Sequence, residues 1–219
     1  MKKVIVFSSL ITLGFLASCG QNASKTEEAQ TAAKADSSAQ AFVMDTAATK
    51  MEWFASKVTG KHNGTLKIKS GELKVQGGKL IAGMFTMDMK SIKVADITEA
   101  ETNAKLTAHL NSEDFFNTST NPEATFELIS AEPIANAATD APNYTLKGNL
   151  TIKGISKAIS FPAKVQLTDD AVNASAEFPI DRTEWDIKYG SGKFFKDLAD
   201  KAINDNFDVK LNISAKKAS

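Results

Sequence analysis

Few residues of this 219-residue chain have side chains suited to catalysis or metal binding. Arg182 is the only arginine among 26 basic residues, and its guanidinium could bind a phosphate or carbonyl group because it donates hydrogen bonds in a rigid fork. The two histidines, His62 and His109, lie far apart in the sequence, so a zinc site would need carboxylates from elsewhere. Cys19 is the only cysteine, which excludes an intramolecular disulfide and a multi-cysteine metal centre.

The known catalytic motifs are missing from the sequence. It contains no Gly-x-Ser-x-Gly elbow, no dinucleotide-binding glycine fingerprint, no phosphate-binding loop and no His-Glu-x-x-His zinc motif. We therefore predict no catalytic residue, no metal and no cofactor. An enzyme acting on an amphipathic substrate through Arg182, His62 or His109 is a minor alternative. Acidic and basic residues number 26 each, without a basic stripe, so no nucleic-acid partner is expected.

The N-terminus has the order of a secretory signal. Lys2 and Lys3 precede an apolar stretch over residues 4–16, and small residues follow. Cys19 ends the sequence Leu-Ala-Ser-Cys, which resembles a bacterial lipobox, where the signal is cleaved before a cysteine that becomes acylated. We predict a lipoprotein signal peptide over residues 1–18. Acylated Cys19 would anchor the protein to a membrane of the bacterial cell envelope, facing the periplasm, with surface exposure left open.

A polar segment follows the predicted anchor. From Gly20 to about Gln40 there is no aromatic or large aliphatic residue, so the segment cannot bury enough apolar surface to offset its ordering entropy. We predict that residues 19–41 comprise the acylated cysteine and a flexible linker. Such a linker of about 20 residues would hold the following domain roughly 25 Å from the membrane.

From Phe42 onward, apolar and polar residues alternate strictly, which is the period of half-buried strands. Turn residues such as Asn63-Gly64 and Asp169-Asp170 separate the runs. The pattern predicts an all-β domain over residues 42–219, either a closed antiparallel barrel or a two-sheet sandwich. Two stretches with near-helical spacing, 98–110 and 193–203, predict one or two short helices that close the ends of the barrel.

Strand phase identifies residues that would face the inside of a barrel. One inward row is expected to hold Ile81, Gly83, Phe85, Met87 and Met89, in which glycine removes volume and the thioethers can repack around a flexible ligand. A solidly packed core is the alternative. The candidate cavity-lining residues are Trp53, Gly83, Phe85, Met87, Met89, Phe126, Leu146, Leu150, Phe161, Val165, Phe178 and Phe207.

Arg182 shares the inward phase of Phe178 and Ile180, so it should lie at the end of an apolar row. A guanidinium there must be paired. It would either face the headgroup of a ligand or form an ion pair. Lys57, in phase with Trp53, is a second headgroup candidate. The candidate carboxylates for an ion pair are Glu184, Asp186 and Asp88.

Several segments, in their order along the chain, resemble the YceI family. They are residues 53–58, 60–64, 87–92, 105–110, 114–116, 122–126, 148–154, 180–185 and 189–192. The resemblance implies an eight-stranded antiparallel lipocalin-like barrel. It also implies an elongated apolar cavity for a polyprenyl chain, a quinone or another amphipathic lipid. It does not imply catalysis.

Together, the anchor, the barrel pattern and the resemblance predict a lipid-anchored, periplasm-facing protein that binds or carries an isoprenoid-type lipid. The alternative is a non-catalytic envelope stress or interaction protein with a filled barrel. Whether the protein forms a homodimer is left open.

Overall fold

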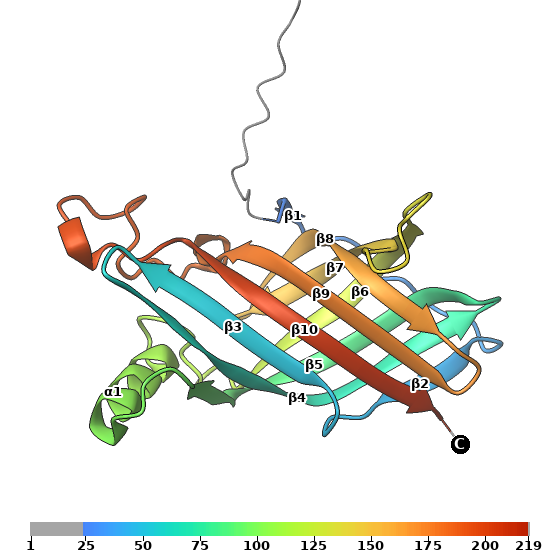
Figure 1. The fold of residues 1–219 in the computed structure, drawn as a ribbon. Coiled ribbons are helices and arrows are strands. Elements are labelled where there is room, and N and C mark those ends of the chain that lie inside the picture. The colour runs from blue at the N-terminus through green and yellow to red at the C-terminus, as the bar shows by residue number, and fades with distance from the viewer. Residues whose placement is uncertain (1–23, 219) are drawn as a thin grey trace, which may run out of the picture.

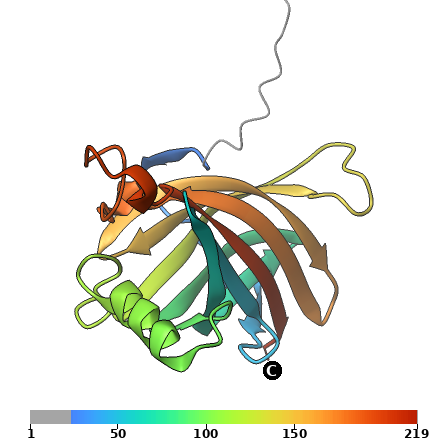
Figure 2. The same cartoon turned by 60° about the vertical axis from the view of Figure 1, so that its left-hand side comes forward.

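The computed structural model describes residues 24–218. Within this range eight strands, β3 to β10, pair antiparallel with their neighbours, and β10 pairs with β3 to close the ring (Figures 1 and 2). This confirms the predicted eight-stranded all-β barrel. The strands are β3 (Lys50–Lys57), β4 (Gly60–Gln76), β5 (Lys79–Val94), β6 (Glu123–Pro133), β7 (Tyr144–Ile152), β8 (Ile155–Leu167), β9 (Ala171–Asp181) and β10 (Asn206–Lys217).

A further strand, β2 (Gln40–Met44), extends the wall beyond the start of β3. It pairs with the last part of β4 on one side and with the end of β10 on the other. Phe42 and Met44 of β2 are buried in the core, while Val43 between them is half exposed. The side chains of this short strand therefore alternate between the inside and the outside of the barrel, as those of the long strands do.

Tight turns explain why consecutive strands pair. Gly77 and Gly78, between β4 and β5, have φ of 57° and 71°, and Lys153 and Gly154, between β7 and β8, have φ of 51° and 74°. Two successive residues with positive φ give the turn whose twist matches a two-residue hairpin. Glycine occupies three of these four positions because it adopts positive φ without steric cost.

One predicted inward position is wrong. The register between β4 and β5 shifts between Lys74 and Val75, so Leu80 of β5 lies opposite Val75 and Ile81 falls at the irregularity. As a result Leu80 is buried and lines a cavity inside the barrel, whereas Ile81 is only half-buried. A bulge adds one residue to a strand and reverses its phase, which strict alternation cannot predict.

The first predicted helix is confirmed as α1 (Ala100–Asn111), which the Glu99 carboxylate caps by accepting hydrogen bonds from the amides of Glu101 and Thr102. Among the described residues, no helix is long and apolar enough to cross a membrane. The second predicted helix, over 193–203, is wrong. Only the 3-10 turn η2 (Ala199–Lys201) forms there, because Asp197 and Ala199 adopt positive φ of 59° and 43°.

The polar segment expected to be a flexible linker is instead partly ordered against the barrel. Strand β1 (Thr26–Glu28) pairs antiparallel with the first half of β8, whose pairing with β9 covers only Ala163–Leu167. The amide of Ser24 donates to the carbonyl of Pro179 in β9, at 3.1 Å. Backbone pairing of this kind needs no apolar side chain, so composition could not predict it. The signal peptide over 1–18 and Cys19 lie outside the described residues.

We call residues 24–39 the N-terminal strap, because the contacts continue beyond β1. The side chain of buried Asn149 accepts a hydrogen bond from the amide of Gln30, at 2.9 Å, and donates one to the Gln30 carbonyl, at 2.6 Å. Further along, the amide of Ala33 donates to the carbonyl of Leu128, at 2.8 Å. The strap therefore begins along the free edge of β8 and continues past Asn149 of β7 to Leu128 of β6.

Replacing Asn149 with alanine should loosen the strap. The change removes both hydrogen bonds to Gln30, which we expect to lower the stability of strap attachment by about 1–2 kcal/mol. Amide hydrogen exchange over residues 26–34 should accelerate accordingly. Asn212→Ala on β10 is the control, and equal exchange in the two variants would contradict the expectation.

The strap should also loosen at acid pH. Hydrogen bonds and charge attraction from Lys147 and then Lys25 lower the pKa of Glu27 from 4.5 to about 2. Because the pKa of Glu27 is lower in the folded state, its ionised carboxylate stabilises the attached strap above about pH 4.5. This stabilisation is lost as the pH falls through about 2. Exchange at residues 26–28, corrected for its intrinsic pH dependence, should rise over that window in the wild type. A Lys147→Met variant with the same pH dependence would contradict this prediction.

Candidate functional site

Two apolar chambers lie inside the barrel, one behind the other. The larger has a volume of about 120 Å³ and extends toward the end of the barrel beside α1, and the smaller has a volume of about 40 Å³. Phe85, Phe126, Phe161 and Leu211 line both chambers. The barrel is therefore not solidly packed, and the space within it suits apolar groups.

The structure distributes the predicted cavity residues over both chambers. Val165 is buried but lines neither chamber, and Lys57 is exposed at the end of β3. Of the remaining candidates, Gly83 and Leu146 line the smaller chamber. The candidates that line the larger chamber alone are Trp53, Met87, Met89, Leu150, Phe178 and Phe207.

Sequence reasoning missed part of the lining of the larger chamber. Phe115 and Phe116, in the turns after α1, and Ile203, in the segment before β10, contribute side chains to it. None of them belongs to an alternating strand, so strand phase gives no signal for them. Met51 and Leu66, which pair across β3 and β4, do lie on strands, and their phase could have identified them.

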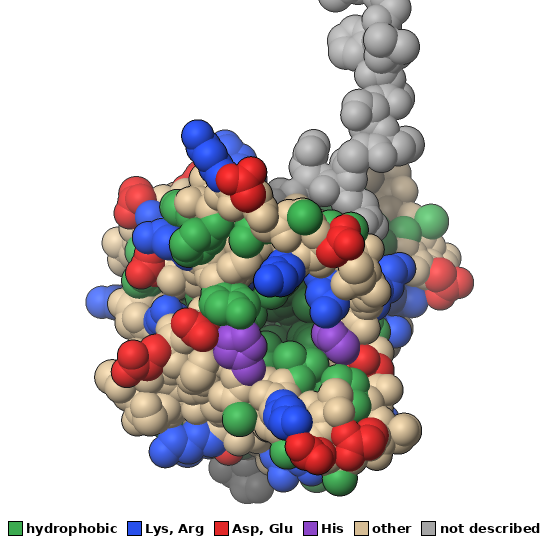
Figure 3. Space-filling view, turned by 90° about the vertical axis from the view of Figure 1, so that its left-hand side faces the viewer, with side chains coloured by type: hydrophobic (Ala, Val, Ile, Leu, Met, Phe, Trp, Pro, Cys, Tyr) green, Lys and Arg blue, Asp and Glu red, His purple; other side chains and the backbone are tan. Residues whose placement is uncertain are grey.

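The two histidines lie on either side of the mouth of the larger chamber, and Figure 3 shows a hollow lined with hydrophobic side chains between them. His62 Nδ1 is 2.8 Å from Asp96 Oδ2, and His109 Nε2 is 3.1 Å from Asp114 Oδ2. Each histidine thus has its own carboxylate partner. Within residues 24–218, no group of three histidine, cysteine or acidic side chains is placed to hold a metal ion.

Aromatic side chains connect α1 to the segment that follows η1 (Arg182–Trp185) at the mouth. The ring of His109 meets the rings of Phe115 and Tyr189 edge-on, with centroids 4.9 and 4.6 Å away. Beyond this contact the same segment exposes Phe194 and Phe195, each about half accessible to solvent. The segment after η1 therefore contacts α1 through Tyr189 and exposes two phenylalanine side chains beyond that contact.

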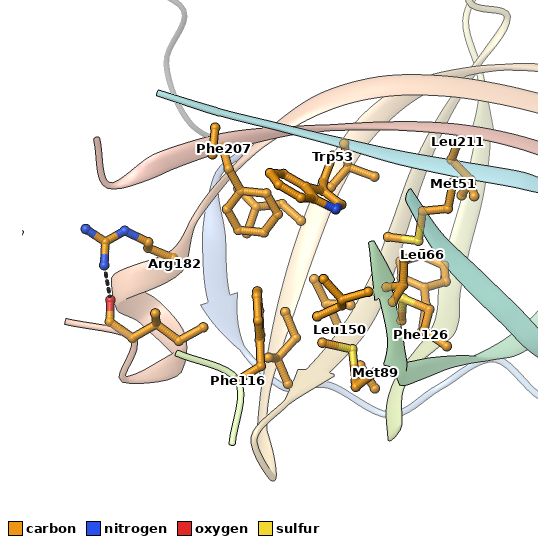
Figure 4. A pocket seen from close by; sticks show the side chains of 18 of the residues that line it. Met51, Trp53, Leu66, Met89, Phe116, Phe126, Leu150, Arg182, Phe207 and Leu211 are labelled. Atoms are coloured by element: carbon orange, nitrogen blue, oxygen red, sulfur yellow. Dashed lines mark hydrogen bonds between the residues drawn. The ribbon is translucent and has the colours of Figure 1, made fainter. Parts of the chain in front are cut away.

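Arg182 lies at the mouth end of the larger chamber and is almost completely buried. Its guanidinium donates to three backbone carbonyls: Nη1 to Ile187 at 2.8 Å, Nε to Asn204 at 3.1 Å and Nη2 to Ile203 at 3.2 Å. Figure 4 draws one of these bonds. Its carboxylate partner is Asp205, at 3.5 Å, rather than Glu184, Asp186 or Asp88.

These contacts make Arg182 a clamp between η1 and the start of β10. Burial lowers the pKa of Arg182, while the charges of Asp205 and Asp181 oppose that effect. Next to the clamp, Trp185 is fully buried and its indole Nε1 donates to the carbonyl of Leu150 at 3.0 Å. Most of the guanidinium N–H groups that could have bound a headgroup thus already donate hydrogen bonds to the protein backbone.

Trp53 carries an unused hydrogen-bond donor. Its indole lies among the side chains that line the larger chamber (Figure 4), and its buried Nε1 has no hydrogen-bond partner among the described residues. An unpaired buried donor is costly. A ligand oxygen placed near the indole would remove that cost.

A closed barrel that encloses apolar chambers behind a partly polar mouth is an architecture suited to apolar or amphipathic molecules. Residues 42–215 match the YceI-like domain, and the chain belongs to this family. The resemblance seen in the ordered sequence segments is thereby confirmed.

Similar proteins from several bacteria show how far the likeness extends. A UPF0312 protein of Pseudomonas aeruginosa is 42% identical over 90 residues, and protein YceI of Escherichia coli O157:H7 is 32% identical over 90 residues. Each match covers 38% of this chain and 44% of the relative, which is less than half of the relative's length.

Two solved structures with the same fold illustrate the structural likeness. BcnA of Burkholderia cenocepacia aligns with a TM-score of 0.61 and 21% identity, covering 78% of this chain and 98% of BcnA. A polyisoprenoid binding domain from Saccharophagus degradans, implicated in plant cell wall breakdown, aligns with a TM-score of 0.56 and 15% identity. That alignment covers 82% of this chain and 99% of the domain. At these identities, the likeness shows the fold alone.

Proposed function

We propose that this protein binds or carries an isoprenoid-type or similar amphipathic lipid, with the tail in the larger chamber. The observation that carries the proposal is the chamber itself, which is enclosed by side chains from β3 to β10 and lined almost entirely by apolar groups. A polyisoprenoid is the ligand class named for one structural neighbour, the Saccharophagus degradans domain.

The arrangement of polar groups supports an amphipathic ligand rather than a purely apolar one. The two histidine–aspartate pairs flank the mouth, while Met87, Met89 and Phe126 line the interior. A lipid inserted tail first would leave its polar end near the mouth, where hydrogen-bond partners and water are available. Methionine thioethers on the wall can repack around tails of differing shape.

The lipid anchor is part of the same proposal. The order of charged, apolar and small residues before Cys19 supports an acylated lipoprotein of the bacterial cell envelope that faces the periplasm. The Ser24 amide is hydrogen-bonded to Pro179, and only four residues lie between Ser24 and Cys19, so the chain from Cys19 to Ser24 spans at most about 17 Å. The strap would thus hold the barrel closer to the membrane than a flexible linker would.

Fluorescence of Trp53 offers a direct test of binding. A quinone with a short isoprenoid tail should quench tryptophan emission saturably, and Trp53→Phe should remove most of the quenching because Trp185 is sealed in the core. Benzoquinone without a tail is the control for collisional quenching. If neither the tailed quinone nor a polyprenol binds, the alternative of an envelope interaction protein gains support.

A further inference from the structure

A layer of phenylalanine rings separates the two chambers. Phe85 of β5 stacks on Phe126 of β6 with ring centroids 5.3 Å apart, and Phe126 lies 5.8 Å from Phe161 of β8. Phe161 in turn stacks on Phe178 of β9 at 3.9 Å, with the ring planes 8° apart. Four strands, in the two consecutive pairs β5–β6 and β8–β9, thus place their rings at one level of the barrel. We call these four rings the aromatic partition.

The partition lies between the chambers rather than at the side of one of them. Phe85, Phe126 and Phe161 line both chambers, and Phe178 completes the wall of the larger one. Figure 4 shows Phe126 at the opposite end of the larger chamber from Arg182, which marks the mouth end. A chain that enters at the mouth therefore reaches the partition at the far end of the larger chamber.

A glycine on β7, Gly148, leaves room for the ring of Phe126, which lies between Phe85 and Phe161 in the partition. Gly148 lies on the strand beside β6, and a Cβ there would be 2.2 Å from Cζ and 2.5 Å from Cε2 of Phe126. Any larger residue would collide with the ring, so the glycine allows Phe126 to reach across the barrel. Gly71 does the same beside Phe85, since a Cβ there would be 2.8 Å from the Cβ of Phe85.

We propose that the aromatic partition sets the length of the lipid tail that the protein accepts, with Phe126 as the residue that determines specificity. The inference rests on the proposed lipid-binding function. A tail that fills the larger chamber fits without rearrangement, whereas a longer tail must displace the Phe126 ring from its stacked neighbours to reach the smaller chamber. Loss of the stacking contacts then opposes the binding of long tails.

Replacing Phe126 with alanine should join the chambers. We would measure displacement of the tailed quinone by geraniol, farnesol, geranylgeraniol and solanesol, which differ in the number of isoprene units. Wild-type affinity should rise with tail length and then fall. In Phe126→Ala the preferred tail should be longer. For the shortest tail at which wild-type affinity has fallen, the affinity of Phe126→Ala should be about tenfold higher than that of the wild type.

Two milder variants control for damage to the core. Phe126→Leu should shift the length preference in the same direction, although less. Phe42→Leu removes a buried phenylalanine that lies outside both chambers, and it should leave the preference unchanged. In the Phe126→Ala background, Leu146→Trp would fill the smaller chamber and should restore the wild-type preference.

The outcomes distinguish this inference from the proposed function. If the wild type binds none of the four alcohols and no tailed quinone, the proposed function fails and the partition has no role in tail selection. If the wild type binds them and neither Phe126 variant changes the preferred length, lipid binding stands and the partition is not a length limit.

Discussion

Replacing Arg182 with methionine is expected to lower the free energy of unfolding by about 3–5 kcal/mol. The variant would leave three carbonyl groups, those of Ile187, Ile203 and Asn204, without the donor that satisfies them. It would also remove the buried cation beside the carboxylate of Asp205, which would keep only the exposed ammonium of Lys193, 3.7 Å away. Chemical denaturation followed by circular dichroism measures the loss.

Lys193→Met is the matched control, because Lys193 contacts the carboxylates of Asp181 and Asp205 from an exposed position. An exposed ion pair of this kind contributes at most about 1 kcal/mol. Arg182→Lys should be intermediate, since it keeps the charge and loses the fork. If Arg182→Met unfolds like the wild type and only loses ligand, Arg182 serves a headgroup rather than the fold.

Filling the larger chamber should remove ligand binding without harming the fold. Ala124 of β6 lines that chamber, is only 2% exposed and lies opposite Met87. In Ala124→Phe the new ring would occupy space that the tail needs, so affinity for the tailed quinone should fall by about tenfold or more. Filling a cavity usually stabilises a protein by about 0.5–2 kcal/mol, so the melting temperature should hold or rise.

Ala171→Phe at the start of β9 adds the same ring away from both chambers and should bind the quinone like the wild type. Unchanged affinity in Ala124→Phe would place the ligand outside the larger chamber. A large fall in melting temperature would show instead that the chamber cannot accept the ring, and Ala124→Leu would then be the variant to compare.

Much of the fold could be predicted because each strand has an apolar inner face and a polar outer face. Apolar and polar residues therefore alternate along the sequence. In β7, for instance, Leu146, Gly148 and Leu150 face inward as their phase requires. The exceptions arise where backbone geometry decides. The bulge at Ile81 changes the phase at the start of β5, and positive φ at Asp197 breaks an otherwise helical pattern.

The strap shows another limit of sequence reasoning. Thr26–Glu28 has no apolar side chain to bury, yet its backbone pairs with the free edge of β8. Such edge pairing depends on where β8 and β9 separate, which is a property of the whole barrel. The composition of the strap predicts that its side chains add nothing to the apolar core. It cannot predict that the strap pairs with the free edge of a strand.

The sequence predicts which residues face the cavity, but it does not predict how far along the barrel axis each of them lies. Strand phase identified Phe85, Phe126 and Phe161 as inward residues, but it could not show that their rings meet at one level and divide the cavity. Nor could it pair Arg182 with Asp205, which lies just before the neighbouring strand β10. Both facts depend on the stagger of strands around the barrel.

The most direct measurement is the identity of what the protein carries in its own cell envelope. Wild-type protein and Ala124→Phe would be purified from that compartment without detergent, weighed by native mass spectrometry and extracted with organic solvent. We predict that the wild type retains a species with a polyprenyl or quinone mass and that Ala124→Phe does not. A wild-type barrel that is empty and also refuses added quinone would contradict lipid binding.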